Sequence, residues 1–366
     1  MEGICDTPAA GPRHDIAPVI DSVWYCSRYP DVAHAGIDPV AHYLDAGWRE
    51  GRWPSPVFDP ECYRAQAPEA AEEEPLGHYL SIGEALGRRP IAWFDPRWYR
   101  AAQSLPDGTS SLAHYLAHRT DGTVSPNPDF DVRFYRERYA DIGVADIDPY
   151  EHFMLAGRTE GRLPRRESDI LRGSGLVDPN YYFINGPDVH EAGLDAVEHY
   201  TQRGWQEQRR PNPYFDGVWY RQRYAPPGTM SPLCHYVLDG EAQGFRPSLY
   251  FDPAWYRDAY GLPAAQSPLR HYLSHRAERG VSPLPLFDIG FYKSRHGAEL
   301  GRARDIFAHY LAVGAARDLD PSPWFNAAAY RAAHMTGRPP PPNTPGEALL
   351  NPLLHFLATF VLGAAR

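Results

Sequence analysis

One arrangement of apolar and polar residues recurs nine times along the chain. Each copy opens with an apolar residue followed by Asp or Asn, places a tyrosine four residues later, and then reaches a histidine followed by Tyr or Phe. The opening residues are Asp21, Asp59, Asp95, Asp131, Asp178, Asp216, Asp252, Asp288 and Asn326. The tyrosines are Tyr25, Tyr63, Tyr99, Tyr135, Tyr182, Tyr220, Tyr256, Tyr292 and Tyr330. The histidines are His42, His78, His114, His152, His199, His235, His271, His309 and His355.

The seventh copy shows which elements this pattern predicts. The Asp252 side chain can cap backbone N–H groups, and Pro253 suits the first helical position because its missing donor costs nothing there. This helix is expected to end near Gly261, since glycine readily takes the left-handed conformation at a helix end. Ser267 and Pro268 give the same start signal for a second helix. Each copy is therefore predicted to be a pair of short helices.

The second helix of this copy is amphipathic. Leu269, Tyr272 and Leu273 fall on one face, and His271 and His275 fall on the opposite face, at about 100° per residue. A helix pair of this size cannot bury its own apolar face, so neighbouring copies must stack to form a continuous core. The expected fold is all-α, with nine tandem helix-pair repeats that form a solenoid or curved superhelix.

The spacing between Asp and His indicates an internal duplication. The separations are 21, 19, 19 and 21 residues in the first four copies, return in the same order in the next four, and reach 29 in the ninth. Equivalent residues such as Asp21 and Asp178 lie 157 residues apart. A block of four copies is therefore predicted to have been duplicated.

This duplication sets the expected boundaries. Copies one to four cover 21–162, and copies five to eight cover 178–325. The segment 326–366 is expected to be a divergent ninth repeat or a C-terminal cap. The segments 1–20 and 163–177 are predicted to be a flexible N-terminal tail and a junction loop.

Composition narrows the class of partner. The 366 residues include 36 Lys and Arg against 46 Asp and Glu, which gives a formal charge of −10. Nucleic acid is not an expected partner, because neutralising phosphates requires a basic surface. Hydrophobic residues make up 43% and charged residues 22% of the chain, which is typical of a folded globular protein.

The cysteine spacing and the hydropathy of the chain indicate in which cellular compartment the protein is expected. Cys5, Cys26, Cys62 and Cys234 lie far apart and form no C-x-x-C motif, so neither a zinc knuckle nor a disulfide framework is indicated. The segment 1–15 lacks the apolar core of a secretory signal, and the sequence has no run of about 18 apolar residues for a membrane span. We therefore expect a cytoplasmic protein with no membrane span.

The recurring motif resembles a known bacterial repeat. Its elements are FD-P-x-W-Y, then Y-P-D-V-A-x-A-G, then D-P-x-x-H-Y-L-x-x-G-W-x-E-G-R-x-P, seen most fully at 24–60. Repeats similar to these occur beside glycosyltransferase domains of surface-polysaccharide synthesis and in some large secreted calcium-binding proteins. The likeness covers about 16–325 and implies a role in polysaccharide assembly. It implies no catalytic residue, because none has been assigned to these repeats, and the calcium-binding nonapeptides of the secreted group are absent here.

The nine recurring histidines are interpreted as structural. Nine equivalent positions cannot form one active site, and a stacked array reuses the same side chains for packing. We expect each half-buried imidazole to bond a neighbouring helix cap or backbone carbonyl, because an unpaired buried ring would cost about 1–3 kcal/mol. The recurring Asp and Tyr are interpreted as a helix cap and a packed ring.

Candidate binding residues are sought where individual copies depart from the pattern. Five residues after the recurring histidine most copies have glycine, but the third and seventh have Arg119 and Arg276, each preceded by an additional histidine. These arginines are candidates to grip a carboxylate or phosphate together with His118 and His275. An ancestral substitution copied by the duplication is the alternative explanation.

The same two copies suggest a metal site. His114 with His118, and His271 with His275, are i, i+4 pairs on one helical face, a spacing that allows two imidazoles to share a metal ion. Spacing identifies no third ligand. Phosphate loops, Rossmann glycine fingerprints, nucleophile elbows and H-E-x-x-H are all absent from the sequence, so no cofactor is expected.

The leading functional hypothesis is a non-enzymatic helical-repeat scaffold that binds a glycan or a protein of bacterial surface-polysaccharide assembly. The alternative is an accessory region of a glycosyltransferase or a metal-dependent enzyme that uses the paired histidines. Tryptophans outside the strict pattern are candidates to stack on sugar rings. They are Trp48, Trp53, Trp93, Trp205 and Trp324.

The end of the chain suggests self-association. The segment 349–363 is apolar nearly all round, whereas the last repeat of an array normally has a polar outer face. We therefore expect this end to be covered by a second copy, as a homodimer, or by further sequence.

Overall fold

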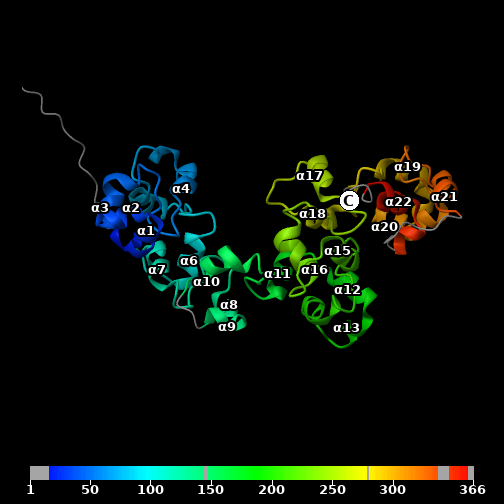
Figure 1. The fold of residues 1–366 in the computed structure, drawn as a ribbon. Coiled ribbons are helices and arrows are strands. Elements are labelled where there is room, and N and C mark those ends of the chain that lie inside the picture. The colour runs from blue at the N-terminus through cyan, green and yellow to red at the C-terminus, as the bar shows by residue number, and fades with distance from the viewer. Residues whose placement is uncertain (1–15, 144–146, 278–279, 337–345, 362–366) are drawn as a thin grey trace, which may run out of the picture. The chain divides into compact units, whose positions relative to one another are not determined.

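The computed structural model describes residues 16–143, 147–277, 280–336 and 346–361 (Figure 1). Two compact units divide the chain: unit 1 is Met1–Arg165 and unit 2 is Arg166–Arg366. The boundary lies within the predicted junction at 163–177. The part of the predicted tail at 1–15 lies outside the described residues, whereas Ile16, Val19 and Ile20 are buried in unit 1 around a short 3-10 turn.

The described residues are all-helical, and contacts between paired helices recur throughout. Their only extended pairings are two isolated bridges, Ser248 with Phe251 and Ser322 with Phe325. Each described helix is too short or too polar to traverse a lipid bilayer. The all-α prediction is confirmed.

Unit 1 contains four helix pairs. The first helices are α1 (Ser22–Arg28), α4 (Pro60–Gln66), α6 (Pro96–Gln103) and α8 (Val132–Arg138). The second helices are α3 (Pro39–His42), α5 (Pro75–His78), α7 (Ser111–His118) and α10 (Pro149–His152). Additional short helices follow two of the first helices, at α2 (Pro30–Ala35) and α9 (Ala140–Gly143).

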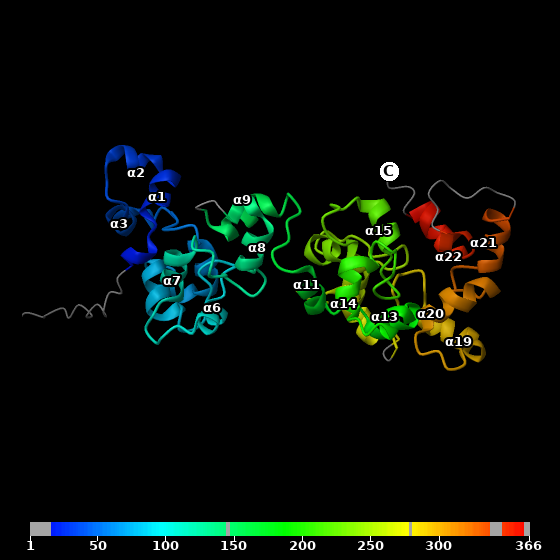
Figure 2. The same cartoon turned by 90° about the horizontal axis from the view of Figure 1, so that it is seen from below.

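Unit 2 contains five helix pairs, and α21 lies beside α22 in both views (Figures 1 and 2). The first helices are α12 (Pro179–Asn185), α15 (Gly217–Tyr224), α17 (Pro253–Tyr260), α19 (Ile289–Leu300) and α21 (Ala327–His334). The second helices are α14 (Ala196–His199), α16 (Pro232–His235), α18 (Pro268–His275), α20 (Ile306–His309) and α22 (Pro352–Phe356). The remaining helices are α11 (Glu167–Ser174) and α13 (Pro187–Glu191).

Seven second helices continue as π-helical turns. The turns are Tyr43–Gly47, Tyr79–Gly83, Phe153–Gly157, Tyr200–Gly204, Tyr236–Gly240, Tyr310–Gly314 and Leu357–Val361. The two exceptions are α7 and α18, which run as eight α-helical residues. They belong to the third and seventh copies, the two that carry arginine in place of glycine.

The predicted capping is confirmed in the seventh copy. Asp252 accepts a hydrogen bond from the Trp255 N–H, and Gly261 ends α17 in the left-handed conformation. Ser267 caps α18 by accepting from the Arg270 N–H. All nine opening Asp or Asn side chains cap their first helix in the same way.

A backbone hydrogen bond closes each of the first eight copies. The N–H of the opening Asp donates to the carbonyl of a proline 31 or 33 residues later, as Asp21 does to Pro54 at 3.1 Å. The other pairs are Asp59 with Pro90, Asp95 with Pro126, Asp131 with Pro164, Asp178 with Pro211, Asp216 with Pro247, Asp252 with Pro283, and Asp288 with Pro321. The recurring proline therefore occupies a position where its carbonyl is used and its missing donor is not needed.

The predicted junction loop is not a loop over most of its length. Residues Glu167–Ser174 form α11, which buries Ile170 and Leu171 against helices of unit 2. Glu167 also accepts a hydrogen bond from the Ser231 N–H, at the start of α16. Pattern reasoning missed this helix because α11 has no side-chain cap and follows two arginines rather than an Asp-Pro pair.

Candidate functional site

Each of the nine recurring histidines bonds the recurring tyrosine of its own copy. The distance from the tyrosine hydroxyl oxygen to the histidine Nδ1 runs from 2.7 Å in the Tyr63 and His78 pair to 3.1 Å in the Tyr292 and His309 pair. The other seven pairs fall between these values. All nine imidazoles are buried or half-buried. The structural role expected for these histidines is therefore supported. The partner that all nine share is a tyrosine hydroxyl rather than the expected cap or carbonyl, although the Nε2 atom of His309 also bonds the Glu299 carbonyl at 3.0 Å.

Burial keeps the tyrosine of each pair protonated. Eight of the nine rings are at most 2% exposed. Burial raises the pKa of Tyr25 to about 12 and that of Tyr182 to about 12. A phenol that keeps its proton at neutral pH can donate to Nδ1, which leaves the imidazole proton on Nε2.

The glycine five residues after the histidine leaves room for this tyrosine. A Cβ atom at Gly83 would overlap the Tyr63 hydroxyl, and one at Gly240 would overlap the Tyr220 hydroxyl. The π-helical turn brings the glycine to that position. In α7 and α18 the helix stays α-helical, so Arg119 lies away from the tyrosine and an arginine is tolerated.

The predicted histidine pairs are brought together as stacked rings. The centroids of His114 and His118 are 4.3 Å apart with planes at 16°, and those of His271 and His275 are 4.0 Å apart at 20°. The Nδ1 atoms of His118 and His275 donate to the backbone carbonyls of His114 and His271 at 2.9 and 2.7 Å. Burial, with a contribution from the charge of His118, lowers the pKa of His114.

Stacking is unsuited to a shared metal ion. An imidazole nitrogen binds a metal along a lone pair that lies in the ring plane, and two nearly parallel planes about 4 Å apart direct their lone pairs side by side. Within the described residues no group of three His, Cys, Asp or Glu side chains has the geometry of a metal site.

Arg119, predicted to bind a ligand anion, instead forms ion pairs with three carboxylates of the chain. Its guanidinium lies 3.1 Å from Asp21, 3.3 Å from Asp148 and 3.2 Å from Glu151. Asp148 caps α10 and its side chain is only 3% exposed. Arg119 thus joins the third copy to the first and fourth copies and is an internal brace.

Arg276 braces unit 2 at the equivalent place. It lies 2.9 Å from Asp305, 3.5 Å from Asp178 and 5.6 Å from the centre of the Tyr214 ring. These aspartates are the counterparts of the unit 1 aspartates, 157 residues later. Neither arginine is available as the ligand-binding group expected from the sequence.

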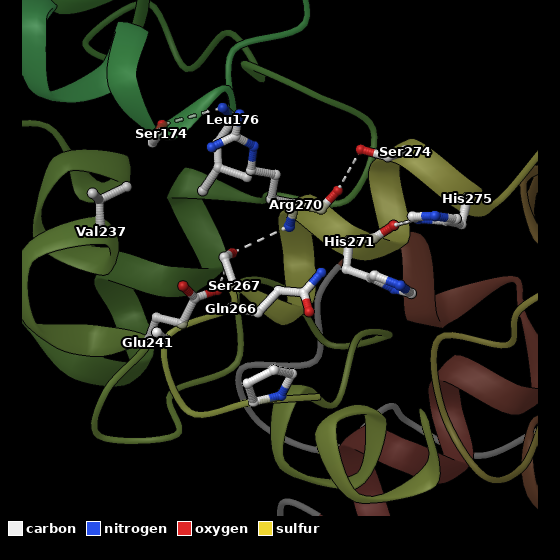
Figure 3. A pocket seen from close by; sticks show the side chains of 12 residues that line it. Ser174, Leu176, Val237, Glu241, Gln266, Ser267, Arg270, His271, Ser274 and His275 are labelled. Carbon is white, nitrogen blue, oxygen red and sulfur yellow. Dashed lines mark hydrogen bonds between the residues drawn. The ribbon is translucent and has the colours of Figure 1, made fainter. Parts of the chain in front are cut away.

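A groove of about 520 Å³ lies in unit 2 beside α18 (Figure 3). Such a volume is within the range of about 300–1,000 Å³ typical of small-molecule sites. Its polar lining comes from Ser174, Glu241, Gln266, Ser267, Arg270, His271, Ser274 and His275. Its apolar lining comes from Leu176, Val237, Pro263 and Ala265. Two of the predicted residues, His271 and His275, therefore line a cavity.

The polar groups of the groove are held by bonds within the chain. Glu241 accepts from the hydroxyls of Ser267 and Tyr236 at 2.7 and 2.9 Å. Ser274 donates to the Arg270 carbonyl at 2.9 Å. In Figure 3 the Arg270 side chain extends towards Leu176, whereas the imidazoles lie on the other side of α18. Arg270 and the two imidazoles therefore approach the groove from different sides of α18.

Sequence reasoning missed Arg270, Gln266 and Glu241. The available signal was the comparison of the two blocks, because the residues 157 positions before Arg270 and Gln266 are Ala113 and Thr109. Of the five tryptophans considered for sugar stacking, four are half-buried, and Trp324 is 89% exposed. None of the five lines the groove.

The chain was compared with protein-family models, curated proteins and solved structures. No protein-family model, curated protein or solved structure matches the chain.

Proposed function

We propose that the protein is a non-enzymatic binding scaffold, a solenoid of nine helix-pair repeats whose unit 2 groove holds a glycan or a protein partner. One observation carries the proposal: the recurring histidines and tyrosines are bonded to each other in all nine copies. Residues used in this way stabilise the fold and supply no chemistry.

A glycan is the ligand that the groove chemistry supports best. Sugars present hydroxyl groups on their edges and C–H groups on their faces, so a sugar site needs hydrogen-bonding side chains next to apolar ones. The groove has amide, hydroxyl, imidazole, carboxylate and guanidinium groups beside Leu176, Val237 and Pro263. The resemblance to repeats of polysaccharide synthesis leads to the same ligand class. We propose a cytoplasmic location on the grounds of the cysteine usage, and a bacterial source on the grounds of the resemblance.

A glycan array tests this proposal, with the intact protein as the probe. We expect specific binding that is weakened by His275→Ala, which alters the groove, and retained by His118→Ala, its counterpart in unit 1. Failure of the intact protein to bind any glycan would contradict glycan binding. Metal analysis of the same preparation tests the alternative, because a stoichiometric metal ion that both variants lose would favour a metal-dependent enzyme.

The C-terminal copy carries the proposed homodimer contact. Leu353, Leu354 and Leu357 are buried, but Leu350 is 75% exposed and Trp324 is 89% exposed. In two earlier copies the residue equivalent to Trp324 packs on the second helix of the next copy. Trp93 lies 4.5 Å from the Tyr150 ring, and Tyr250 lies 6.1 Å from the Phe307 ring, between centroids.

Light scattering over a range of concentrations tests the dimer. We expect concentration-dependent dimerisation that Trp324→Ser weakens. A wild-type protein that stays monomeric at high concentration would contradict it.

A further inference from the structure

Arg270 is the cationic group of the groove. It is exposed, and among the described residues no Asp or Glu lies within ion-pair distance of it. Its guanidinium instead lies 3.4 Å from the carbonyl of Gly173, at the C-terminal end of α11. A single weak bond of this length positions the side chain but leaves its charge uncompensated.

The two units differ at three of the polar positions that line the groove, Gln266, Arg270 and Ser274. Residues 157 positions earlier are Thr109 for Gln266, Ala113 for Arg270 and Ala117 for Ser274. The bonded framework around these positions is the same in both units. Tyr99 with His114 matches Tyr256 with His271, both at 2.8 Å. The lining has therefore diverged around the same tyrosine and histidine pair: unit 2 has a positive charge and a serine hydroxyl where unit 1 has alanines, and an amide where unit 1 has a threonine hydroxyl.

We propose that the unit 2 groove binds an acidic glycan, with a carboxylate or phosphate group of the glycan paired to Arg270. This inference rests on the proposed function and specifies the ligand class of its site. The planar guanidinium offers two parallel N–H groups to either anion. The Oε1 atom of Glu241 accepts hydrogen bonds from two hydroxyl groups of the chain, so this carboxylate is held in place within the groove lining.

The remaining lining fits the neutral part of such a glycan. The exposed Gln266 amide and the lone pairs of the Ser274 hydroxyl face the groove as partners for sugar hydroxyls. Val237 and Pro263 supply apolar contact.

The test is an array of acidic and neutral glycans probed with three proteins: the wild type, Arg270→Ala and Arg302→Ala. Arg270→Ala gives unit 2 the residue found in unit 1. Arg302 is an exposed arginine of unit 2 outside the groove, so its loss is a matched control for charge. We expect the wild type to prefer acidic glycans, and Arg270→Ala to bind them at least about tenfold more weakly, as the loss of a charged hydrogen bond predicts. Arg302→Ala should bind like the wild type.

Competition separates the two sources of the anion. Inhibition by glucuronate but not by inorganic phosphate assigns a carboxylate, and the reverse assigns a phosphate. A preference for neutral glycans, or equal binding by wild type and Arg270→Ala, would overturn the inference while leaving the proposed function intact. Absence of binding to every glycan would overturn both.

Discussion

Arg119 in the third copy and Arg276 in the seventh copy are held by different partners in the two units. In unit 1 three carboxylates surround Arg119, including Glu151 at 3.2 Å. In unit 2 the counterpart of Glu151 is Ala308, which has no charge. Arg276 instead lies over the ring of Tyr214, whose counterpart in unit 1 is Val57. The Tyr214 hydroxyl donates a hydrogen bond of 2.7 Å to Asp305, which also forms an ion pair with Arg276.

This comparison separates what the fold requires from what it allows. The arginine and the two aspartates it joins are present in both units and make the same ion pairs in each. The third partner is a carboxylate in one unit and a phenol in the other, and the groove lining differs in a similar way. Residues at these variable positions are free to take on a binding function, whereas the paired tyrosines and histidines are not.

Removing the brace should have the largest effect, and a larger one in unit 1. Arg119→Ala leaves the nearly buried Asp148 without its cation, so unit 1 should lose about 3 kcal/mol, the lower end for a broken buried pair. Arg276→Ala should cost unit 2 about 1–2 kcal/mol, because Asp305 is 20% exposed and keeps the Tyr214 hydroxyl. Hydrogen exchange over α10 and α20 measures the two losses separately. Equal losses would show that burial of the aspartate does not set the strength of the brace.

Alanine at the glycine of the π-helical turn should cost the same in both units. Gly83→Ala and Gly240→Ala each push a Cβ atom into a tyrosine hydroxyl, and overpacking of this kind costs about 1–3 kcal/mol. Gly244→Ala is the control for glycine loss in unit 2, because no atom lies within 4 Å of its Cβ position, although its φ of +72° adds backbone strain. Denaturant unfolding should give matching losses for the first two. A tolerated substitution at either one would contradict the shared framework.

Removing one tyrosine hydroxyl should have a smaller effect. Tyr99→Phe and Tyr256→Phe each leave an imidazole without its partner and should cost about 1 kcal/mol. NMR of the imidazole nitrogens should show that the tautomer of the bonded histidine is no longer fixed. Unchanged spectra and an unchanged free energy of unfolding would mean that the bond neither fixes the histidine tautomer nor stabilises the fold.

The smallest expected effect is a loss of stability in acid. Because the pKa of His114 is lowered in the folded chain, the unfolded chain takes up a proton first as the pH falls. The stability from this residue is therefore present above the ordinary histidine pKa and is lost as the pH falls through the folded value. His118→Ala should reduce the loss by removing a neighbouring charge, which unfolding curves between pH 7 and 5 would reveal. An identical acid profile in His118→Ala would contradict this assignment.

The sequence predicted those parts of the fold that depend on local signals. Asp252 with Pro253 and Ser267 with Pro268 mark the starts of α17 and α18, because capping acts within a few residues. It did not predict the partners of Arg119, because Asp21 and Glu151 come next to it only after the copies have packed. Side chains brought together by packing leave no local spacing to recognise.

The candidate site was predicted only in part. His275 was found because it departs from the repeat, and His271 because it lies four residues before it on the same helix; both line the groove. Their stacking was not foreseen, because helical spacing fixes which rings are neighbours but not their orientation. Arg270 stands out only beside its counterpart in the other block, Ala113, because its position has no shared residue type in the repeat.

One measurement tests the central claim, that binding follows the groove lining and stability follows the tyrosine and histidine framework. It compares glycan affinity and unfolding free energy in two variants of unit 2: the triple replacement Gln266→Thr, Arg270→Ala and Ser274→Ala, and the single replacement Tyr182→Phe. The account predicts that the triple variant unfolds like the wild type but loses binding, while Tyr182→Phe loses about 1 kcal/mol of stability and keeps binding. Retained binding in the triple variant, or lost binding in a folded Tyr182→Phe protein, would contradict it.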